Sequence, residues 1–546
     1  MSLRHLLTPF AALLALSVSL QAAAQSFLVQ CPDVSSTGTG TALHPYAKAA
    51  ALATRNVPGY PAAVAGNIKC QQVVGTDGYA TMADGNQIYM FGFGPGSGLD
   101  LLSLGLPGTQ TAADFNGAAY VPAGAAGGVP QGSFNSPYFA DGLTPDPSYN
   151  KNLPTNRNAG IYDPSQLMNW GVLSANQPAP LIAIDEDDEL FLTLSNVGMI
   201  MRPDLFEQHT IHFHGYPNAS SYFDGVPDDS VAIAIAGSMT YYYTAPDAGT
   251  YFWHCHITPP EHLQMGMVGQ LYVRPRQNRT PASTTVANPS CATMTLSSGA
   301  VVQDILCSAP PVPGATATTA PVLYTQPAVP QKFAYNDGDG STRYDVEYPI
   351  QMMGFDPNFH YVGMTFNPED FAGMKDKYYL LSGRGYPDTV ADVTPGAVDA
   401  SGNPDAQTGT QSTAASDGLA RPSQPLPSHI VINRSTGGQT RALLRLSNLS
   451  VTELSTLGTI GVPMTVVGWN ARMLRDLAGN NLAYNTNSIT IGGGESADVI
   501  LDVSDSAYAA CTAAAPCTFF LYSPQLDHLV NDAENFGGMM TEILVQ

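Results

Sequence analysis

The sequence is poor in charge, and above all in basic charge. Only 12% of the 546 residues are charged, and 21 lysines and arginines stand against 44 aspartates and glutamates. A net charge of −23 argues against a nucleic-acid partner, because nucleic-acid binding needs a basic surface. Beyond its first residues the chain also lacks an apolar run long enough for a membrane-spanning helix. We therefore expect no nucleic acid and no membrane span.

The first residues have the composition of an export signal. An early arginine, an apolar stretch and a group of small residues precede Gln25, which is the pattern of a secretory signal peptide. The sequence predicts a signal peptide over residues 1–24 and a mature protein that is secreted or periplasmic.

Glycine and proline, unlike charged residues, are abundant in this sequence. The 52 glycines and 43 prolines are typical of a turn-rich all-β protein. Short β-rich runs alternate with turn signals in two long segments, which a stretch rich in proline, alanine and threonine separates. The sequence predicts an N-terminal extension at 25–69, a first β domain at 70–275, a linker at 276–320 and a second β domain at 321–546.

The two β domains echo each other. "GTYFWHCHITPPEHLQMGMVGQLYV" of the first parallels "CTFFLYSPQLDHLVNDAENFGGMMTEILV" of the second, and "HTIHFHGYP" is matched to "VPMTVVGWNARML". In this alignment residues 523–525 of the second domain replace residues 254–256 of the first. We interpret the chain as a duplicated β-sandwich in which only the first copy binds metal.

One cysteine stands apart from the other six. An exported chain can keep disulfides, and six cysteines form sequence-local pairs: Cys31 with Cys70, Cys291 with Cys307, and Cys511 with Cys517. The seventh, Cys255, lies between two histidines in "HCH". This is the pattern expected if Cys255 is a thiolate ligand.

The histidines are concentrated around this cysteine. Six of the eleven lie between His209 and His262, in "HTIHFHG" and "HCHITPPEHLQMGM". So dense a group of soft and borderline ligands indicates a metal site.

Strand parity divides these side chains into two groups. Successive side chains of a strand point to opposite faces, so His254 and His256 face one way and Cys255 the other. If the two histidine motifs lie on adjacent strands, one side collects Cys255 and His209. The other side then collects His254, His256, His212 and His214, and the H-C-H segment connects two metal positions.

The first group has the composition of a blue-copper site. Two histidines, one thiolate and a weak axial methionine form such a ligand set, and His209, Cys255, His262 and Met267 supply it. Met265 is an alternative axial ligand.

These motifs resemble those of the multicopper oxidases. "HTIHFHG" is similar to the family's H-P-x-H-x-H-G motif, and "HCHITPPEHLQMGM" is similar to its H-C-H…H…G-M motif with two extra residues. "DGVP" and "GQLYVRP" extend the likeness over residues 185–275, and the second domain resembles the family's copper-free middle domain. The resemblance implies that each domain is a cupredoxin Greek-key β-sandwich, that copper is the cofactor, and that the protein is a laccase-like oxidoreductase.

The resemblance also implies roles for single residues. His209, Cys255, His262 and Met267 fall on the mononuclear blue copper. The other histidines fall on the second centre: His212 on the normal (type 2) copper, and His214, His254 and His256 on the coupled (type 3) pair. Asp224 in "YFDGVP" matches an acidic residue that assists proton delivery to oxygen, although a turn aspartate before glycine has the same pattern.

The chain departs from the family in one respect. The family's copper cluster takes eight histidines from two domains, whereas this chain offers one set of four. His360, His429 and His528 are isolated and are expected to be structural. Either another subunit of a homo-oligomer supplies the missing histidines or there is no such cluster.

Three functions fit these features. The first is a copper-dependent oxidase that takes single electrons from a phenolic, metal-ion or redox-protein donor and passes them to oxygen. The alternatives are a copper nitrite reductase-like enzyme and a blue-copper electron carrier or copper-binding protein without oxygen chemistry.

Overall fold

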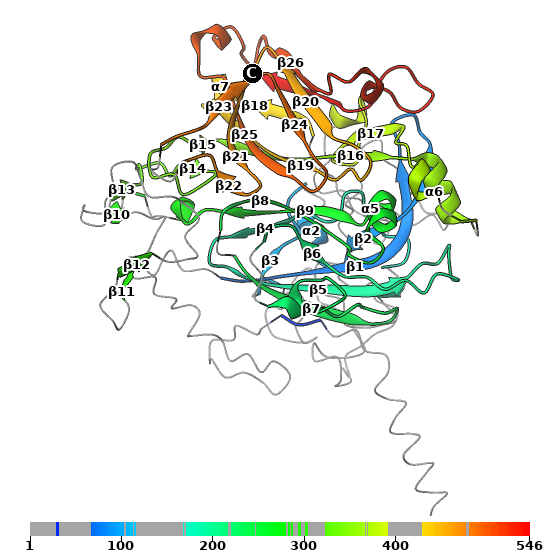
Figure 1. The fold of residues 1–546 in the computed structure, drawn as a ribbon. Helices are drawn as coiled ribbons and strands as arrows, with labels where there is room; N and C mark the ends of the chain where they lie inside the picture. Colours follow the sequence, from blue (N-terminus) through cyan, green and yellow to red (C-terminus); the bar gives the residue numbers. More distant parts are fainter. Residues whose placement is uncertain are drawn as a thin grey trace, which may run out of the picture.

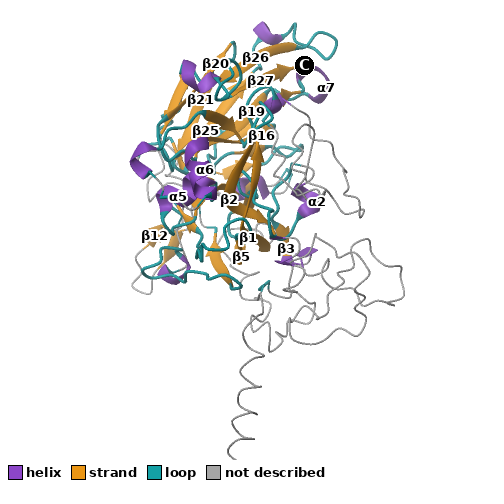
Figure 2. Ribbon diagram, turned by 90° about the vertical axis from the view of Figure 1, so that its right-hand side faces the viewer, coloured by secondary structure: helices purple, strands orange, loops and turns teal. Residues whose placement is uncertain are grey.

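The chain folds into two β-sandwiches with short helices between strands (Figures 1 and 2). The computed structural model describes residues 29–31, 67–115, 167–303 and 323–546, with short gaps inside the last three ranges and a longer gap at 391–427. Both sandwiches have the cupredoxin-like arrangement expected, so the predicted all-β fold class is confirmed.

The first sandwich is built from two sheets. One has the strand order β2-β1-β5-β7, with β3 beside β1, and the other has the order β4-β9-β8-β6. The bounds are β1 Ile68–Thr81, β2 Gln87–Pro95, β3 Gln110–Thr111, β4 Ile182–Asp185, β5 Glu189–Gly198, β6 His212–Phe213, β7 Ser238–Thr244, β8 Gly249–His254 and β9 Val268–Arg274.

Alternation along β5 explains how this sandwich closes. Leu190, Leu192 and Leu194 are fully buried in the core between the two sheets, and each contributes roughly 1.5–3 kcal/mol by its burial. Across the core, Trp253 of β8 lies opposite Gly269 of β9. A Cβ at Gly269 would lie 2.6 Å from the indole ring, so this glycine makes room for the largest core side chain.

The second sandwich repeats this plan with extra strands. Its sheets have the orders β17-β16-β19-β25-β21-β22, with β23 beside β21, and β18-β27-β26-β20-β24. The bounds are β16 Val346–Phe355, β17 Tyr378–Leu381, β18 Ile430–Ile432, β19 Arg441–Asn448, β20 Ser455–Ile460, β21 Met464–Trp469, β22 Arg472–Met473, β23 Tyr484–Thr486, β24 Ser488–Ile491, β25 Ser496–Asp502, β26 Cys517–Tyr522 and β27 Met540–Val545.

The strand pairing confirms the duplication. The parallel pair β1 and β5 recurs as β16 and β19, and the antiparallel pair β8 and β9 recurs as β26 and β27. The strand that pairs with β8 is β6, and the strand that pairs with β26 is β20. The sequence alignment was wrong here: "VPMTVVGWNARML" forms β21 and β22, which extend the other sheet, so it is not the counterpart of "HTIHFHGYP".

The register also corrects the H-C-H alignment by one residue. His212 pairs with His254, and Gly458 pairs with Tyr522 at the corresponding place in the second sandwich. Residues 522–524 therefore correspond to residues 254–256, so Ser523, not Pro524, stands where the first sandwich has its cysteine. The alignment of sequence letters failed because the strands β21 to β23 have no partner in the first sandwich.

Strand β8 forms the seam between the two sandwiches. Thr250 Oγ1 donates to Asp498 Oδ1 at 2.7 Å, and Gln270 Nε2 of β9 donates to the Arg445 carbonyl at 2.9 Å. All four residues are buried. The sheet that carries His254 is thus fixed to the second sandwich.

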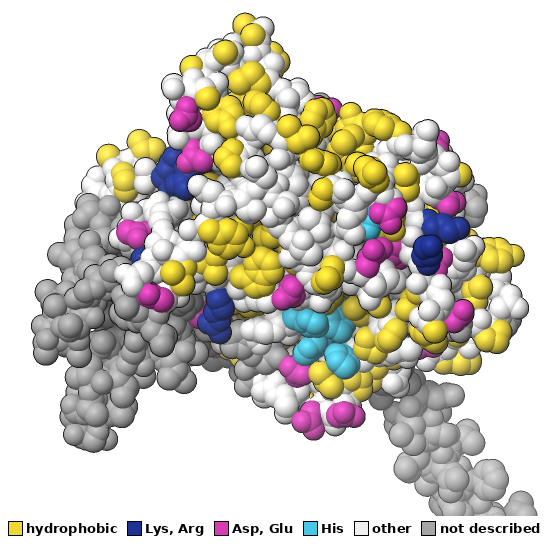
Figure 3. Space-filling view, turned by 45° about the horizontal axis from the view of Figure 1, so that its top comes forward, with side chains coloured by type: hydrophobic (Ala, Val, Ile, Leu, Met, Phe, Trp, Pro, Cys, Tyr) yellow, Lys and Arg dark blue, Asp and Glu magenta, His cyan; other side chains and the backbone are white. Residues whose placement is uncertain are grey.

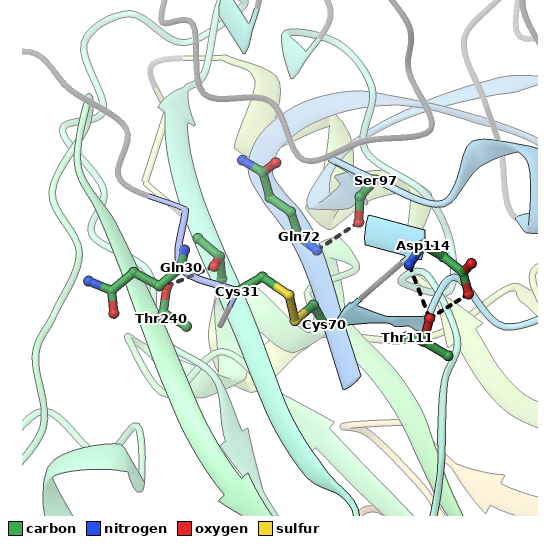
Figure 4. Close-up of a disulfide and its surroundings, with 9 residues drawn as sticks. Gln30, Cys31, Cys70, Gln72, Ser97, Thr111, Asp114 and Thr240 are labelled. Atoms are coloured by element: carbon green, nitrogen blue, oxygen red, sulfur yellow. Dashed lines mark hydrogen bonds between the residues drawn. A yellow bond between two sulfur atoms is a disulfide. The ribbon is translucent and has the colours of Figure 1, made fainter. Parts of the chain in front are cut away.

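Two of the three expected disulfides are present. Cys31 bonds to Cys70 at the start of β1, and the Gln30 amide donates to Thr240 Oγ1 at 3.3 Å, so part of the expected N-terminal extension is fixed to the first sandwich (Figure 4). Cys511 bonds to Cys517 in the second sandwich. The Cys291–Cys307 pair and the signal peptide at 1–24 lie outside the described residues.

The remaining elements are short. They are α2 Leu99–Leu102, α5 Pro259–Met265, α6 Pro357–Met364, α7 Arg434–Gly437, η2 Ser221–Phe223, η3 Arg276–Arg279, η4 Phe371–Gly373, η5 Asp388–Val390, η6 Ser506–Tyr508, η7 Leu526–Leu529, β10 Thr285–Ala287, β11 Thr293–Thr295, β12 Val301–Gln303, β13 Leu323–Thr325, β14 Lys332–Phe333 and β15 Arg343–Tyr344. Within the described ranges, none of the helices has both the length and the apolar character needed to cross a bilayer.

Candidate metal centre

The two histidine motifs lie on neighbouring strands, which was the condition of the parity argument. β6 and β8 pair antiparallel, with His212 directly opposite His254. Cys255 follows β8 and is fully buried, with the opposite orientation. The histidines and the cysteine therefore separate into two groups, each with ligand atoms within 4.8 Å of one another.

The first group, which we call the sulfur site, consists of His209, Cys255 and His262. The Cys255 sulfur lies 3.3 Å from His262 Nδ1 and 3.9 Å from His209 Nδ1. All three side chains are fully buried, and Cys255 is a free cysteine. The Thr210 amide donates to the sulfur at 3.4 Å, a contact that stabilises a thiolate.

Local structure brings these three residues together. His209 is held by a backbone bridge to Ile233, in which its amide donates to the Ile233 carbonyl at 3.1 Å. His262 lies on α5, whose first turn contains two prolines. Proline fits the first turn of a helix because the amide that it lacks has no helical partner there.

Two methionines lie near the sulfur site, and their surroundings differ. Met267 is fully buried, and its carbonyl accepts a hydrogen bond from the Cys255 amide at 3.1 Å. Met265 points elsewhere, because a Cβ at Gly363 of α6 would lie only 3.2 Å from its sulfur. This packing against α6 favours Met267 over Met265 as the axial ligand.

The sulfur site suits a soft metal cation. Burial lowers the pKa of His262, but the Cys255 thiolate and Glu207 outweigh it and raise the pKa to about 10. Burial and the neighbouring His262 hold the pKa of His209 well below its ordinary value. A thiolate and imidazoles enclosed in an apolar core are costly unless a cation compensates the charge, and copper prefers this donor set.

The second group, which we call the histidine face, consists of His212, His214 and His254. The Nδ1 atoms of His212 and His254 donate to the carbonyls of Asp224, at 2.8 Å, and Cys255, at 2.6 Å. These bonds leave both Nε2 atoms with lone pairs for a metal. Such second contacts fix the tautomer of metal-binding histidines.

The geometry of the histidine face also suits a cation. His254 Nε2 lies 2.8 Å from His214 Nε2. The Nδ1 side of His214 lies against Gly494, whose backbone accepts a hydrogen bond from the ring. The lone pairs of the two Nε2 atoms therefore face and repel each other. A positive ion between them would be coordinated by both.

Burial keeps His214 and His254 neutral, the form that binds metal. It lowers the pKa of His254 to about 3 and, with the nearby His212, lowers the pKa of His214 to about 4. His214 is nonetheless exposed on one side, and His212 and His256 are half-buried. Figure 3 shows histidine side chains gathered in one surface patch beside acidic side chains.

His256 lies beside the histidine face rather than inside it. Its ring centroid is 5.1 Å from that of His212 and 5.5 Å from that of His254. Three of the four histidines expected on this side therefore converge, and the fourth is their immediate neighbour.

Asp224 lies next to the histidine face. Its Oδ2 is 3.5 Å from His212 Nδ1, although the stronger contact to that ring comes from its own carbonyl. The following Gly225 has a positive φ, and a Cβ there would meet the Ile211 carbonyl at 1.9 Å. Only glycine at this position of the "DGVP" turn lets the turn pack closely enough for Asp224 to contact His212.

Several residues at the site were not predicted from the sequence. Glu207 Oε2 lies 3.6 Å from His262 Nε2, and the Tyr241 hydroxyl accepts from the Ile211 amide at 3.1 Å. A Cβ at Gly75 would lie 2.7 Å from His209 Cδ2. Glu207 could have been predicted, because it lies two residues before His209 and so shares its parity. Tyr241 and Gly75 could not, because neither is near the motifs in sequence.

One isolated histidine has the structural role expected of it. Both ring nitrogens of His360 lie within hydrogen-bond distance of backbone carbonyls, those of Tyr89 at 2.5 Å and Gln264 at 2.8 Å. It joins α6 to the first sandwich and offers no free ligand atom.

Known proteins are similar to part of this chain in sequence. Residues 148–277 match the family model described as multicopper oxidase. The multicopper oxidase MCE of Talaromyces pinophilus is 30% identical over 115 residues, which are 21% of this chain and 18% of the relative. Laccase abr2 of Aspergillus fumigatus is 34% identical over 104 residues, which are 19% of this chain and 16% of the relative. This chain thus spans less than a fifth of the length of either relative.

Solved structures give matches of low identity. A blue copper oxidase from Nitrosomonas europaea aligns with 87% of this chain and 85% of its own at 15% identity, with a TM-score of 0.45. A copper nitrite reductase from the same organism aligns with 87% of this chain and 94% of its own at 11% identity, with a TM-score of 0.42.

Both groups lie within residues 148–277, the segment that matches the multicopper oxidase family model. Copper is the cofactor that this family implies, and the two groups of ligands fit it.

Proposed function

We propose that this protein is an exported copper-dependent oxidase with two metal positions in its first sandwich. His209, Cys255, His262 and Met267 would hold a blue copper. His212, His214, His254 and His256 would hold copper at the histidine face. Copper supplies one-electron transfer at the first position and oxygen binding at the second.

One observation carries the proposal. Cys255 belongs to the sulfur site while its neighbour His254 belongs to the histidine face, so one peptide bond separates the two groups. The His254 Nδ1 hydrogen bond to the Cys255 carbonyl adds a second link at 2.6 Å. This main-chain segment is a short through-bond path from one position to the other.

Electrons would enter at the His262 edge of the sulfur site. His262 is itself fully buried, whereas Glu207, 3.6 Å from its outer nitrogen, is partly exposed. A carboxylate there attracts cationic donors and accepts a hydrogen bond from a phenol. The donor classes that we propose remain phenolics, metal ions and redox proteins.

Protons would reach the histidine face through Asp224. Reduction of oxygen to water consumes protons as well as electrons, and this carboxylate stands beside His212 with 30% of its side chain exposed. It can therefore exchange protons with solvent and deliver them at the face.

The wider organisation is part of the proposal. Residues 70–275 form the copper-binding domain, residues 321–546 form the copper-free domain, and a homo-oligomer completes the histidine face. The disulfides Cys31–Cys70 and Cys511–Cys517 support export, since they persist in oxidising compartments.

Copper counting with two turnover assays tests the function. The oxidase should hold more than one copper per chain and consume oxygen with a phenolic or metal-ion donor, without reducing nitrite. Nitrite turnover without oxygen uptake would instead identify a nitrite reductase-like enzyme. About one copper per chain with neither activity would identify an electron carrier.

A further inference from the structure

The second sandwich repeats the backbone of the sulfur site. In the first, the Met267 amide donates to the His262 carbonyl at 2.8 Å. In the second, the Met539 amide donates to the His528 carbonyl at the same distance. All four side chains are buried. His528 and Met539 therefore stand at the positions of the second histidine and the axial methionine.

The same register places Ser523 at the position of the cysteine. The Cys255 amide donates to the Met267 carbonyl at 3.1 Å, and the Ser523 amide donates to the Met539 carbonyl at 2.9 Å. Ser523 is fully buried, as is Cys255. The exchange replaces one sulfur atom by oxygen without moving the backbone.

Ser455 stands where the first sandwich has His209. His209 forms a backbone bridge with Ile233, and Ser455 pairs antiparallel with Ile491. His209 lies three residues before His212, which pairs with β8. Ser455 likewise lies three residues before Gly458, which pairs with β26.

The surroundings of the retained histidine are conserved between the two sandwiches. Glu207 lies 3.6 Å from His262 Nε2, and Glu453 lies 3.2 Å from His528 Nε2. In both sandwiches a carboxylate thus faces the outer nitrogen. The inner nitrogen, Nδ1, faces the Cys255 sulfur at 3.3 Å in the first sandwich, and in the second it is buried without a hydrogen-bond partner.

One further difference explains how the second sandwich fills the vacated space. Gly75 pairs with Asn196 of β5, and Met352 pairs with Asn448 of β19 at the same place in the register. Gly75 must lack a side chain because His209 would clash with it. With serine in place of that histidine, the fully buried Met352 can occupy the corresponding volume.

We propose that the second sandwich holds a silent copy of the sulfur site, in which His528 and Met539 keep the positions of two of the four ligands. Ser455 and Ser523 have replaced the other two ligands, and Met352 fills the position of the lost imidazole. Its ligand class is a soft transition-metal cation, and three substitutions restore it: Ser523→Cys, Ser455→His and Met352→Gly. The identification of ligands rests on the proposed sulfur site of the first sandwich.

The test uses the full chain in a Cys255→Ser background, so that the first sandwich contributes no thiolate. With the three restoring substitutions, Cu(II) should produce a thiolate-to-copper band of the same order of intensity as that of the unaltered protein. Adding His528→Gln should remove this band. A folded variant that binds no copper through the new thiolate, or whose band survives His528→Gln, would overturn the proposal.

A smaller set of substitutions covers the case in which the first variant does not fold. The variant Cys255→Ser with Ser523→Cys exchanges a thiol for a hydroxyl at position 255 and a hydroxyl for a thiol at position 523. The second sandwich then has three of the four ligands. Co(II) should then give a thiolate charge-transfer absorption that His528→Gln abolishes, and its absence in the folded protein would equally overturn the proposal. The band of the unaltered protein tests the first site separately, so the two failures are distinguishable.

Discussion

His254 and Cys255 are consecutive residues whose side chains serve different groups. The imidazole Nε2 of His254 lies 2.8 Å from His214 Nε2, while the Cys255 sulfur lies 3.3 Å from His262 Nδ1 on the other side of the chain. The alternation of side chains at the end of a strand is the physical cause. Each prediction below depends on this separation or on the packing that maintains it.

The axial position distinguishes the two methionines. Met267→Leu should leave copper bound and raise the reduction potential of the sulfur site, because the axial thioether is a weak ligand that tunes the metal. Met265→Leu is the matched control and should leave the potential unchanged, since Met265 packs against Gly363 of α6. Redox titration of the visible band measures both. A shift only in the control would transfer the axial role to Met265.

The space for His209 depends on a glycine far away in sequence. Gly75→Ala places a Cβ 2.7 Å from His209 Cδ2 and should displace the ring. We expect copper affinity at the sulfur site to fall roughly tenfold or more, the usual size of effects next to a ligand. Gly458→Ala is the control, because the nearest atom to its Cβ is 3.4 Å away. Competition with a chelator measures the affinity, and equal values for the two variants would refute this packing argument.

The histidine face should depend on association of subunits. It offers four histidines where the family's cluster takes eight, and an exposed half-site holds metal weakly or completes its coordination with water. Sedimentation combined with copper analysis and oxygen uptake should show that oxygen reduction appears only with the oligomer. A strictly monomeric protein that reduces oxygen at a good rate would show that one set of histidines suffices.

A partly buried ion-pair network, in which Glu347 binds two arginines, should control stability at acid pH. Glu347 binds Arg274 of β9 at 2.7 Å and Arg445 of β19 at 3.0 Å. Burial raises the pKa of Glu347, but the two arginines outweigh it and lower the pKa from 4.5 to about 2. The stabilisation is therefore fully present above about pH 4.5 and is lost as the pH falls towards 2, with a size of about 3 kcal/mol.

Glu347→Gln tests this dependence. At neutral pH the free energy of unfolding should fall by about 3 kcal/mol, because both arginines lose a buried partner. The difference in the free energy of unfolding between this variant and the unaltered protein should decrease as the pH falls from 4.5 to 2. Asp532→Asn, which removes a surface pair with Lys377 at 3.8 Å, should change stability by less than about 1 kcal/mol. A Glu347→Gln effect that is constant with pH would exclude the ion-pair explanation.

The sequence predicted the two-group arrangement because strand parity is a local property. The order of residues in "HCH" and "HFH" fixes which side chains share a face once the strands are adjacent, and β6 and β8 are adjacent. The all-β duplication was also visible, because similar runs of residues recur near the end of each half.

The contacts that complete the site were not predictable from the motifs. Gly75 and Gly494 reach the histidines, and Tyr241 reaches the Ile211 amide beside them, through long-range packing that leaves no local periodicity. For the same reason the register of the second copy was misplaced by one residue. Only hydrogen bonds such as that from the Ser523 amide to the Met539 carbonyl identify the true counterpart of the cysteine.

Electron paramagnetic resonance with copper analysis, on the copper-loaded protein and its Cys255→Ser variant, tests the central claim most directly. The unaltered protein should show a blue-copper signal with a strong visible band, together with a normal copper signal from the histidine face. Cys255→Ser should lose the blue signal and its band, because serine offers only a hard oxygen, while the normal signal remains. Persistence of the strong band in a folded Cys255→Ser protein, or loss of both signals together, would contradict two metal positions joined through the H-C-H segment.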